Sequence, residues 1–209
     1  MNHQEPHTIV NSLDCKIYLD DTLNICDFPI ENFLTPNEIL HFNKLNTIHK
    51  QNQFKTIRKL RTISLGLTEI QYKDYGAPFL IDKSLHISIS HKNNYVVFGK
   101  SPLKIGLDLE QISTRVAKVK SKFLNEDELD EFSQESDEIY TQLWAAKEAI
   151  YKTLKPPLSF KNDIKLSRDS KGLIFAKIYD NVSTINLNFI KYKDYVLCYV
   201  LLWIQFTIK

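Results

Sequence analysis

Three carboxylates form the most specific chemical pattern in the chain. Asp108 and Glu110 alternate with apolar residues in the segment Gly-Leu-Asp-Leu-Glu at 106–110. Because successive side chains of a strand point to opposite faces, residues two apart share a face, and both carboxylates are expected on one face of a short strand. Glu148 lies later, in the segment 143–152, whose pattern is typical of a helix. If that helix crosses the strand, the three carboxylates converge.

Lysines accompany these carboxylates on the expected helix. Lys152 lies one turn beyond Glu148 on the same helix face, whereas Lys147 points elsewhere and serves either the structure or a phosphate group. Carboxylate oxygens are the ligands that Mg²⁺ prefers, and lysine side chains bind phosphate oxygens. The pattern therefore indicates phosphoryl-group chemistry on a diphosphate substrate.

The bulk composition is that of an ordinary globular protein. The 209 residues allow one domain or two small ones, and a chain of this length can bury a core of its own. Hydrophobic residues make up 43% of the chain and charged residues 25%, as in typical globular domains. The net charge of +2, without a recognition motif, does not favour a nucleic-acid partner.

The cysteines and the apolar segments favour a cytoplasmic protein. Cys15, Cys26 and Cys198 are scattered and form no CxxC pair, so neither a disulfide framework nor a zinc site is expected. Residues 1–6 are polar and lack a signal-peptide core. The apolar run 195–204 is too short to span a bilayer as a helix and is predicted to be a buried strand, so no membrane association is expected.

Two capping boxes mark the start of expected helices. Thr35 and Glu38 begin one helix that runs toward Leu45, and Asn125 and Glu128 begin another. A third helix is predicted over 53–63, ending at Gly66, with four basic residues on its wetter faces: Lys55, Arg58, Lys59 and Arg61. Further helices are expected at 115–123 and from the Trp144 region to about Leu154, with Trp144 and Phe123 in the core.

The remaining pattern is strand-like. Residues 16–19 predict a first strand, and 85–90 and 95–99 predict a hairpin joined by the loop 92–94. Toward the C-terminus, alternation predicts strands at 164–166, 173–179, 185–192 and 195–206. Glycine is scarce, and no glycine-rich phosphate loop is present. Helices and strands mix without regular alternation, so the expected class is α+β.

The break at Ser101-Pro102 divides the chain in two. We expect an N-terminal α+β half at 1–100 and a C-terminal α+β half at 101–209 that carries the metal site. The two halves show loosely similar orders of helices and strands, without a sequence repeat that would establish duplication.

Three segments together resemble one protein family. They are Ile-Ser-Ile-Ser-His at 87–91, Ile-Gly-Leu-Asp-Leu-Glu at 105–110, and the segment from Trp144 to Lys152 that contains Lys147-Glu148. In this order they resemble the 4′-phosphopantetheinyl transferases, in their monomeric surfactin-type branch. Each motif alone arises by chance in many proteins, whereas the ordered set is specific. The resemblance spans nearly all of residues 30–205 and includes the turn at 75–78.

This resemblance implies a fold and an activity. The family fold is two similar α+β halves packed as a pseudo-dimer, with coenzyme A held in the cleft between them. Such enzymes, which include holo-[acyl-carrier-protein] synthases, transfer 4′-phosphopantetheine from coenzyme A to a serine of an apo acyl or peptidyl carrier protein. Adenosine 3′,5′-bisphosphate is released, and the reaction depends on Mg²⁺. The resemblance thus implies a cytoplasmic monomer whose partners are coenzyme A and a carrier protein.

The resemblance also assigns roles to residues. Asp108, Glu110 and Glu148 would hold Mg²⁺, and Glu148 would also accept the serine proton, directly or through water. Lys152 would neutralise a pyrophosphate oxygen of coenzyme A and assist the leaving group. The remaining candidates for coenzyme A contacts are Ser90, His91 near the 3′-phosphate, Lys55 and Arg58.

Two positions depart from the family pattern. Ala77 stands where the family usually has a lysine that helps to bind coenzyme A, and Lys83 or Lys92 could take over that role. Ala145 replaces the usual serine or threonine after Trp144. Ala77 favours an alternative: a degenerate homologue that binds coenzyme A or a carrier protein without catalysis. The pattern does not distinguish Mg²⁺ from Mn²⁺, or one carrier pathway from another.

Overall fold

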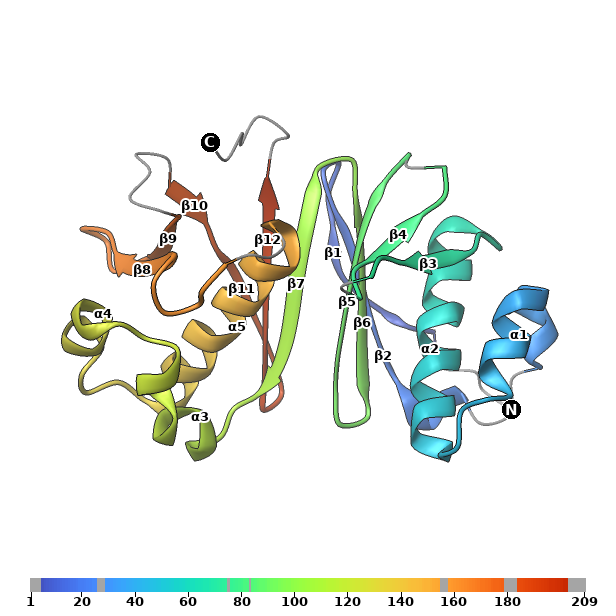
Figure 1. The fold of residues 1–209 in the computed structure, drawn as a ribbon, viewed down its shortest axis with the longest axis horizontal. Helices are drawn as coiled ribbons and strands as arrows, with labels where there is room; N and C mark the ends of the chain where they lie inside the picture. Colours follow the sequence, from blue (N-terminus) through green and yellow to red (C-terminus); the bar gives the residue numbers. More distant parts are fainter. Residues whose placement is uncertain are drawn as a thin grey trace. The chain divides into compact units, whose positions relative to one another are not determined.

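The protein is described by a computed structural model that covers residues 5–25, 29–74, 76–82, 84–154, 158–178 and 184–202. The chain divides into two compact units, Met1–Leu103 and Lys104–Lys209. Each unit combines antiparallel strands with helices (Figure 1). The predicted α+β class is therefore confirmed. No helix in the described ranges is long and apolar enough to cross a membrane.

The first unit is built on a four-stranded antiparallel sheet with the order β1-β2-β6-β5. Its strands are β1 (His7–Asn11), β2 (Lys16–Asp21), β5 (His86–Lys92) and β6 (Tyr95–Ser101). A smaller sheet pairs β3 (Ile70–Tyr72) with β4 (Pro78–Leu80). The helical elements are η1 (Thr22–Ile25), η2 (Ile30–Asn32), α1 (Pro36–Phe42) and α2 (Ile48–Leu65).

The predicted hairpin is present between β5 and β6. Lys92 pairs with Tyr95, and only Asn93 and Asn94 lie between them. Asn93 has a φ of 52°, a left-handed conformation that asparagine adopts more readily than most residues. This tight turn places Ser90 and His91 near the end of β5.

The prediction for the charged face of α2 is wrong. Lys55, Arg58, Lys59 and Arg61 were expected on wet faces, but all four are buried. Lys59 Nζ lies 2.8 Å from Asp20 Oδ2 on β2, and both arginines pair with Glu38 on α1. For Arg58, Lys59 and Arg61, partners distant in sequence therefore bring the charge into the interior of the unit, since a buried charge requires an opposite charge nearby.

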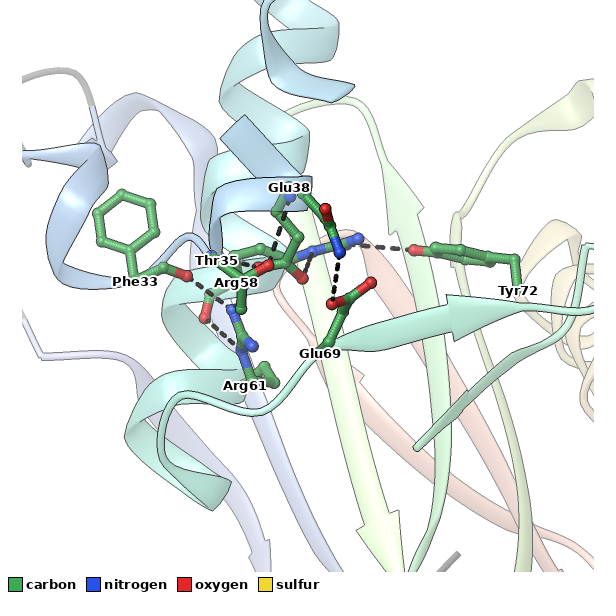
Figure 2. Close-up of polar contacts among 8 residues, drawn as sticks. Phe33, Thr35, Glu38, Arg58, Arg61, Glu69 and Tyr72 are labelled. Atoms are coloured by element: carbon green, nitrogen blue, oxygen red, sulfur yellow. Dashed lines mark hydrogen bonds and ion pairs between the residues drawn. The ribbon is translucent and has the colours of Figure 1, made fainter. Parts of the chain in front are cut away.

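Glu38 is the centre of this buried network (Figure 2). The capping box predicted for Thr35 and Glu38 is present at the start of α1. Glu38 also accepts from Arg58 Nε at 2.8 Å and from Arg61 Nη2 at 2.9 Å. Burial raises the pKa of Glu38, but the Thr35 backbone hydrogen bond and the two guanidinium groups outweigh it, and the net pKa is lowered. The network ties α1 to α2 by charge.

The second unit contains two three-stranded antiparallel sheets. One has the order β11-β12-β7 and the other β10-β9-β8; the strands are β7 (Lys104–Gln111), β8 (Ile164–Arg168), β9 (Ile174–Ile178), β10 (Thr184–Asn186), β11 (Asn188–Tyr192) and β12 (Tyr195–Leu202). The helical elements are α3 (Thr114–Lys118), η3 (Lys120–Lys122), α4 (Glu126–Glu131) and α5 (Asp137–Leu154).

Two predicted elements of this unit differ in detail, and a third is described only in part. The single strand expected at 185–192 is two strands, β10 and β11, which belong to different sheets. The helix expected at 115–123 is the short α3 followed by η3. The strand that begins at Tyr195 is described as far as Leu202, and the rest of the predicted range lies outside the described residues.

Helix α5 packs directly against β7 and β12. Its small residues Ala145 and Ala149 are fully buried and share a core with Cys198 and Val200 of β12. At Gly106 on β7, a Cβ atom would lie 2.0 Å from the Ala149 carbonyl oxygen and 2.0 Å from Thr153 Oγ1. Only glycine therefore permits this approach of helix and strand.

Gly106→Ala is expected to destabilise the protein by about 3 kcal/mol, the upper end of the usual cost of overpacking a core. The reason is that one of the two clashing atoms is a helix backbone oxygen, which cannot rotate away. Urea unfolding followed by circular dichroism measures the change. An unchanged unfolding midpoint would show that α5 can shift away from β7 at little cost.

The described cysteines are buried. Cys15 and Cys198 are free thiols, and Cys26 lies outside the described residues. Burial, together with nearby Asp14, raises the pKa of Cys15 to about 12. Burial and the charge of Asp108 also raise the pKa of Cys198. Both thiols therefore stay protonated and unreactive at neutral pH.

Candidate active site

Strand β7 carries Asp108 and Glu110 on the face that meets α5. Alternation along the strand puts both on the same side as Gly106, and Gly106 contacts α5. In the ladder with β12, Asp108 is opposite Cys198 and Glu110 is opposite Val196. The strand therefore presents two carboxylates, two residues apart, toward one helix.

Helix α5 contributes the facing lysine. Lys152 Nζ lies 2.6 Å from Asp108 Oδ1 and also donates to the Leu107 carbonyl at 3.1 Å. The Asp108 side chain is 6% exposed and that of Lys152 29% exposed, so this ion pair lies at the edge of the core. In this structure the lysine that was predicted to neutralise a pyrophosphate oxygen neutralises Asp108.

Glu148 lies within the field of both strand carboxylates. Burial is the main factor that raises its pKa, to about 7, and the charges of Asp108 and Glu110 raise it further, while Lys152 opposes the shift. Glu148 thus interacts electrostatically with Asp108 and Glu110. A carboxyl group with a pKa near neutrality can both take up and release a proton at physiological pH.

The chemistry of these donors fits a magnesium ion, although the ligands are not assembled around one point. Three carboxylates supply hard oxygen ligands, and a dication would offset the mutual repulsion that raises the pKa of Glu148. In the described part of the chain, however, no group of three or more His, Cys, Asp or Glu side chains is arranged to hold a metal ion. Asp108 is instead paired with Lys152, at 2.6 Å. The assignment of Asp108, Glu110 and Glu148 as metal ligands stays a prediction.

Trp144 contacts this site, which the sequence interpretation did not anticipate. Phe123 is buried in the core as expected, and Trp144 packs against that core while remaining partly exposed. Its indole Nε1 donates to Glu110 Oε1 at 3.3 Å. The spacing of Trp144 and Glu148, one helical turn apart, was the available signal that both share the helix face toward β7.

Lys147 serves the structure of the unit. Its side chain is fully buried, and Nζ lies 2.7 Å from Glu128 Oε1. It also donates to the carbonyls of Phe123 and Phe160, each at 2.8 Å. Burial lowers the pKa of Lys147 to about 8, and the charge of Glu128 opposes that shift. Of the two roles left open for Lys147, the structure assigns the structural one.

Glu128 connects Lys147 to two further segments, α4 and β8. It completes the predicted capping box with Asn125 at the start of α4. Its Oε1 also accepts from the backbone N–H of Leu166 on β8 at 2.8 Å. The Lys147–Glu128 pair therefore joins α4, α5 and β8 around one buried charge pair.

Apart from Lys152, the predicted coenzyme A contacts lie in the first unit. Ser90 is buried and His91 is exposed, with His91 Nδ1 lying 3.4 Å from Gln53 Nε2 of α2. Lys55 is buried on α2, and the charge of Arg58 is balanced by Glu38. These roles stay predictions, of which Arg58 is the weakest because its guanidinium already has a carboxylate partner.

Of the residues involved in the departure from the family pattern, Ala77 and Lys92 are described by the structure. Ala77 is partly exposed, immediately before β4. Lys92, one proposed substitute for the missing lysine, ends strand β5, whereas Lys83, the other, lies outside the described residues.

Comparison with known proteins supports the resemblance that the motifs predict. Residues 104–200 match the family model of the 4′-phosphopantetheinyl transferase superfamily. The chain is 34% identical over 85 residues to the 4′-phosphopantetheinyl transferase gsp of Aneurinibacillus migulanus. That match covers 39% of this chain and 35% of the relative, so it spans about a third of the relative's length. The predicted resemblance to this superfamily is confirmed.

Two matching solved structures align with about half of the chain. One is the Helicobacter pylori holo-[acyl-carrier-protein] synthase in complex with coenzyme A, with 23% identity, a TM-score of 0.39, and coverage of 46% of this chain and 97% of that chain. Another is the holo-acyl-carrier-protein synthase from Plasmodium yoelii, with 24% identity, a TM-score of 0.39, and coverage of 47% and 92%.

Proposed function

We propose that this protein is a Mg²⁺-dependent 4′-phosphopantetheinyl transferase. It would move phosphopantetheine from coenzyme A to a serine of an apo acyl or peptidyl carrier protein and release adenosine 3′,5′-bisphosphate. The observation that carries the proposal is that α5 places Glu148 and Lys152 against Asp108 of β7, inside the residues that match the superfamily. We further propose that it acts as a cytoplasmic monomer.

The reaction requires little covalent help from the protein. The serine oxygen attacks the β-phosphorus of coenzyme A, and the bond from that phosphorus to the bridging oxygen breaks. Such transfers depend on positioning and on neutralising charge. Mg²⁺ bound by Asp108, Glu110 and Glu148 would supply Lewis-acid neutralisation of the pyrophosphate oxygens.

The chain's own residues would handle the proton and the remaining charge. Glu148, with a pKa of about 7, is suited to accept the serine proton at neutral pH. Lys152 already neutralises a carboxylate in this site, and its partly exposed ammonium can reach a phosphate oxygen once Asp108 has another cationic partner. Ser90 and His91 would contact the phosphates of coenzyme A.

Product analysis separates this proposal from passive binding. The protein is incubated with coenzyme A, Mg²⁺ and a panel of apo carrier proteins, and adenosine 3′,5′-bisphosphate is measured by chromatography. We expect the bisphosphate to form only with a carrier and only without chelator. Binding of coenzyme A in calorimetry, with no bisphosphate for any carrier, would instead support the degenerate homologue that binds without catalysis.

Glu148 should make the stability of the metal-free protein depend on pH. Its pKa is about 7 when folded, against an ordinary value of 4.5, so the folded state binds the proton more tightly. The stabilisation by this proton is complete below the ordinary value and is lost as pH rises through about 7. In thermal unfolding with chelator present, the wild type should lose stability relative to Glu148→Gln over this range. Parallel pH profiles for the two proteins would contradict the assignment.

A further inference from the structure

Resting on this proposed function, we propose that Trp144 is a positioning residue that orients the Glu110 carboxylate for cation binding. The indole Nε1 donates to Glu110 Oε1 at 3.3 Å. Trp144 precedes Glu148 by one helical turn, so both project from the side of α5 that faces β7. A fixed donor on one carboxylate oxygen restricts rotation of the whole carboxylate.

Two aromatic rings hold the indole in place. The ring of Phe123 lies 5.1 Å from that of Trp144 at an interplanar angle of 75°, and that of Phe160 lies 5.7 Å away at 64°. Both arrangements are edge-to-face contacts, the favoured geometry for aromatic pairs. Tyr151 packs against Phe160 in the same way, with ring centroids 5.1 Å apart. The indole therefore has little room to turn away from Glu110.

Lys147 fixes the backbone beneath both rings. Its ammonium donates to the carbonyls of Phe123 and Phe160, the same two residues whose rings contact Trp144. Lys147 and Trp144 both belong to α5. Lys147 binds the backbone at Phe123 and Phe160, while the indole of Trp144 packs between the rings of these two residues. This arrangement makes the position of Glu110 on β7 depend on the position of α5.

Residues that do not bind the metal themselves can affect a metal site through hydrogen bonds to its ligands. Such partners fix ligand orientation, and their loss typically lowers metal affinity about 10- to 100-fold. Trp144→Phe removes the N–H donor and keeps an aromatic ring between Phe123 and Phe160. We therefore expect the fold to survive and Mg²⁺ affinity in calorimetry to fall about tenfold. The Mg²⁺ concentration for half-maximal transfer should rise, with the maximal rate little changed.

An indole N–H signal provides a readout independent of activity. The chain has two tryptophans, so Trp203→Phe assigns the Trp144 signal in a nitrogen-15 correlation spectrum and is also the control for losing an indole. Adding Mg²⁺ to the wild type should shift the Trp144 signal. Trp203→Phe should keep wild-type Mg²⁺ affinity.

Two results would overturn the inference. One is equal Mg²⁺ affinity in the wild type and Trp144→Phe; the other is a Trp144 indole signal that does not respond to Mg²⁺. If the wild type nevertheless transfers phosphopantetheine, the proposed function stands and only the role of Trp144 falls. If the wild type neither binds Mg²⁺ nor transfers, the proposed function falls with it.

Discussion

Glu148→Gln is expected to lower phosphopantetheine transfer by about 10²- to 10⁴-fold, the range lost when a catalytic proton acceptor is removed, and Asp108→Asn is expected to cause a loss of similar size. Glutamine keeps the size of Glu148 but cannot accept the serine proton. Asparagine removes the charge that Asp108 presents to Lys152 and to a cation. Both variants should fold, because neither change leaves a charge deep in the core. Single-turnover transfer to a carrier protein measures the loss.

Glu126→Gln is the matched control for these variants. Glu126 is an exposed acid on α4, so its neutralisation changes the net charge equally without touching the site. It should transfer at the wild-type rate. Near-wild-type rates for both Glu148→Gln and Asp108→Asn would rule out the assignment of the site.

Lys147→Met is expected to destabilise the protein by about 3–5 kcal/mol, the usual cost of removing one partner of a buried ion pair. Methionine fills most of the lysine volume but leaves the Glu128 carboxylate, 2% exposed, without its cation. The carbonyls of Phe123 and Phe160 lose a donor as well. The free energy of unfolding, measured with urea, gives the effect.

A surface ion pair supplies the comparison. Lys191 pairs with Glu138, but their side chains are 57% and 32% exposed. Lys191→Met should therefore change the free energy of unfolding by no more than about 1 kcal/mol. If Lys147→Met cost no more than this control, the buried pair would not hold the unit together.

Local signals in the sequence were sufficient to predict much of the fold. The capping boxes at Thr35 and Asn125 involve residues three apart, and both are present. The turn at Asn93 likewise depends on a few neighbouring residues. The shared face of Asp108 and Glu110 on β7 also follows from a local signal, since alternation along a strand is enough to put both on one face.

Features that depend on distant partners could not be predicted in this way. Arg58, Lys59 and Arg61 of α2 were expected in solvent because Asp20 and Glu38, which neutralise them, are remote in sequence. The pairing of Lys152 with Asp108 joins residues 44 positions apart. A local sequence pattern does not show whether a charged side chain has an oppositely charged partner in the folded protein.

The candidate site also combines features that a local pattern predicts with features that depend on distant contacts. The sequence pattern predicted its carboxylates and Lys152, but it left the role of Lys147 open and assigned Trp144 only to the core. The structure gives Trp144 a polar contact with Glu110 that only the crossing of α5 over β7 produces. That crossing depends in turn on the missing side chain of Gly106.

The most direct test of the proposed function is the intact mass of an apo carrier protein after incubation with the wild type, coenzyme A and Mg²⁺. We predict a mass gain equal to one phosphopantetheine group on the carrier, and no gain when a chelator is added before the enzyme. A carrier whose mass stays unchanged across the panel, while coenzyme A still binds the protein, would contradict the assignment of this chain as a transferase.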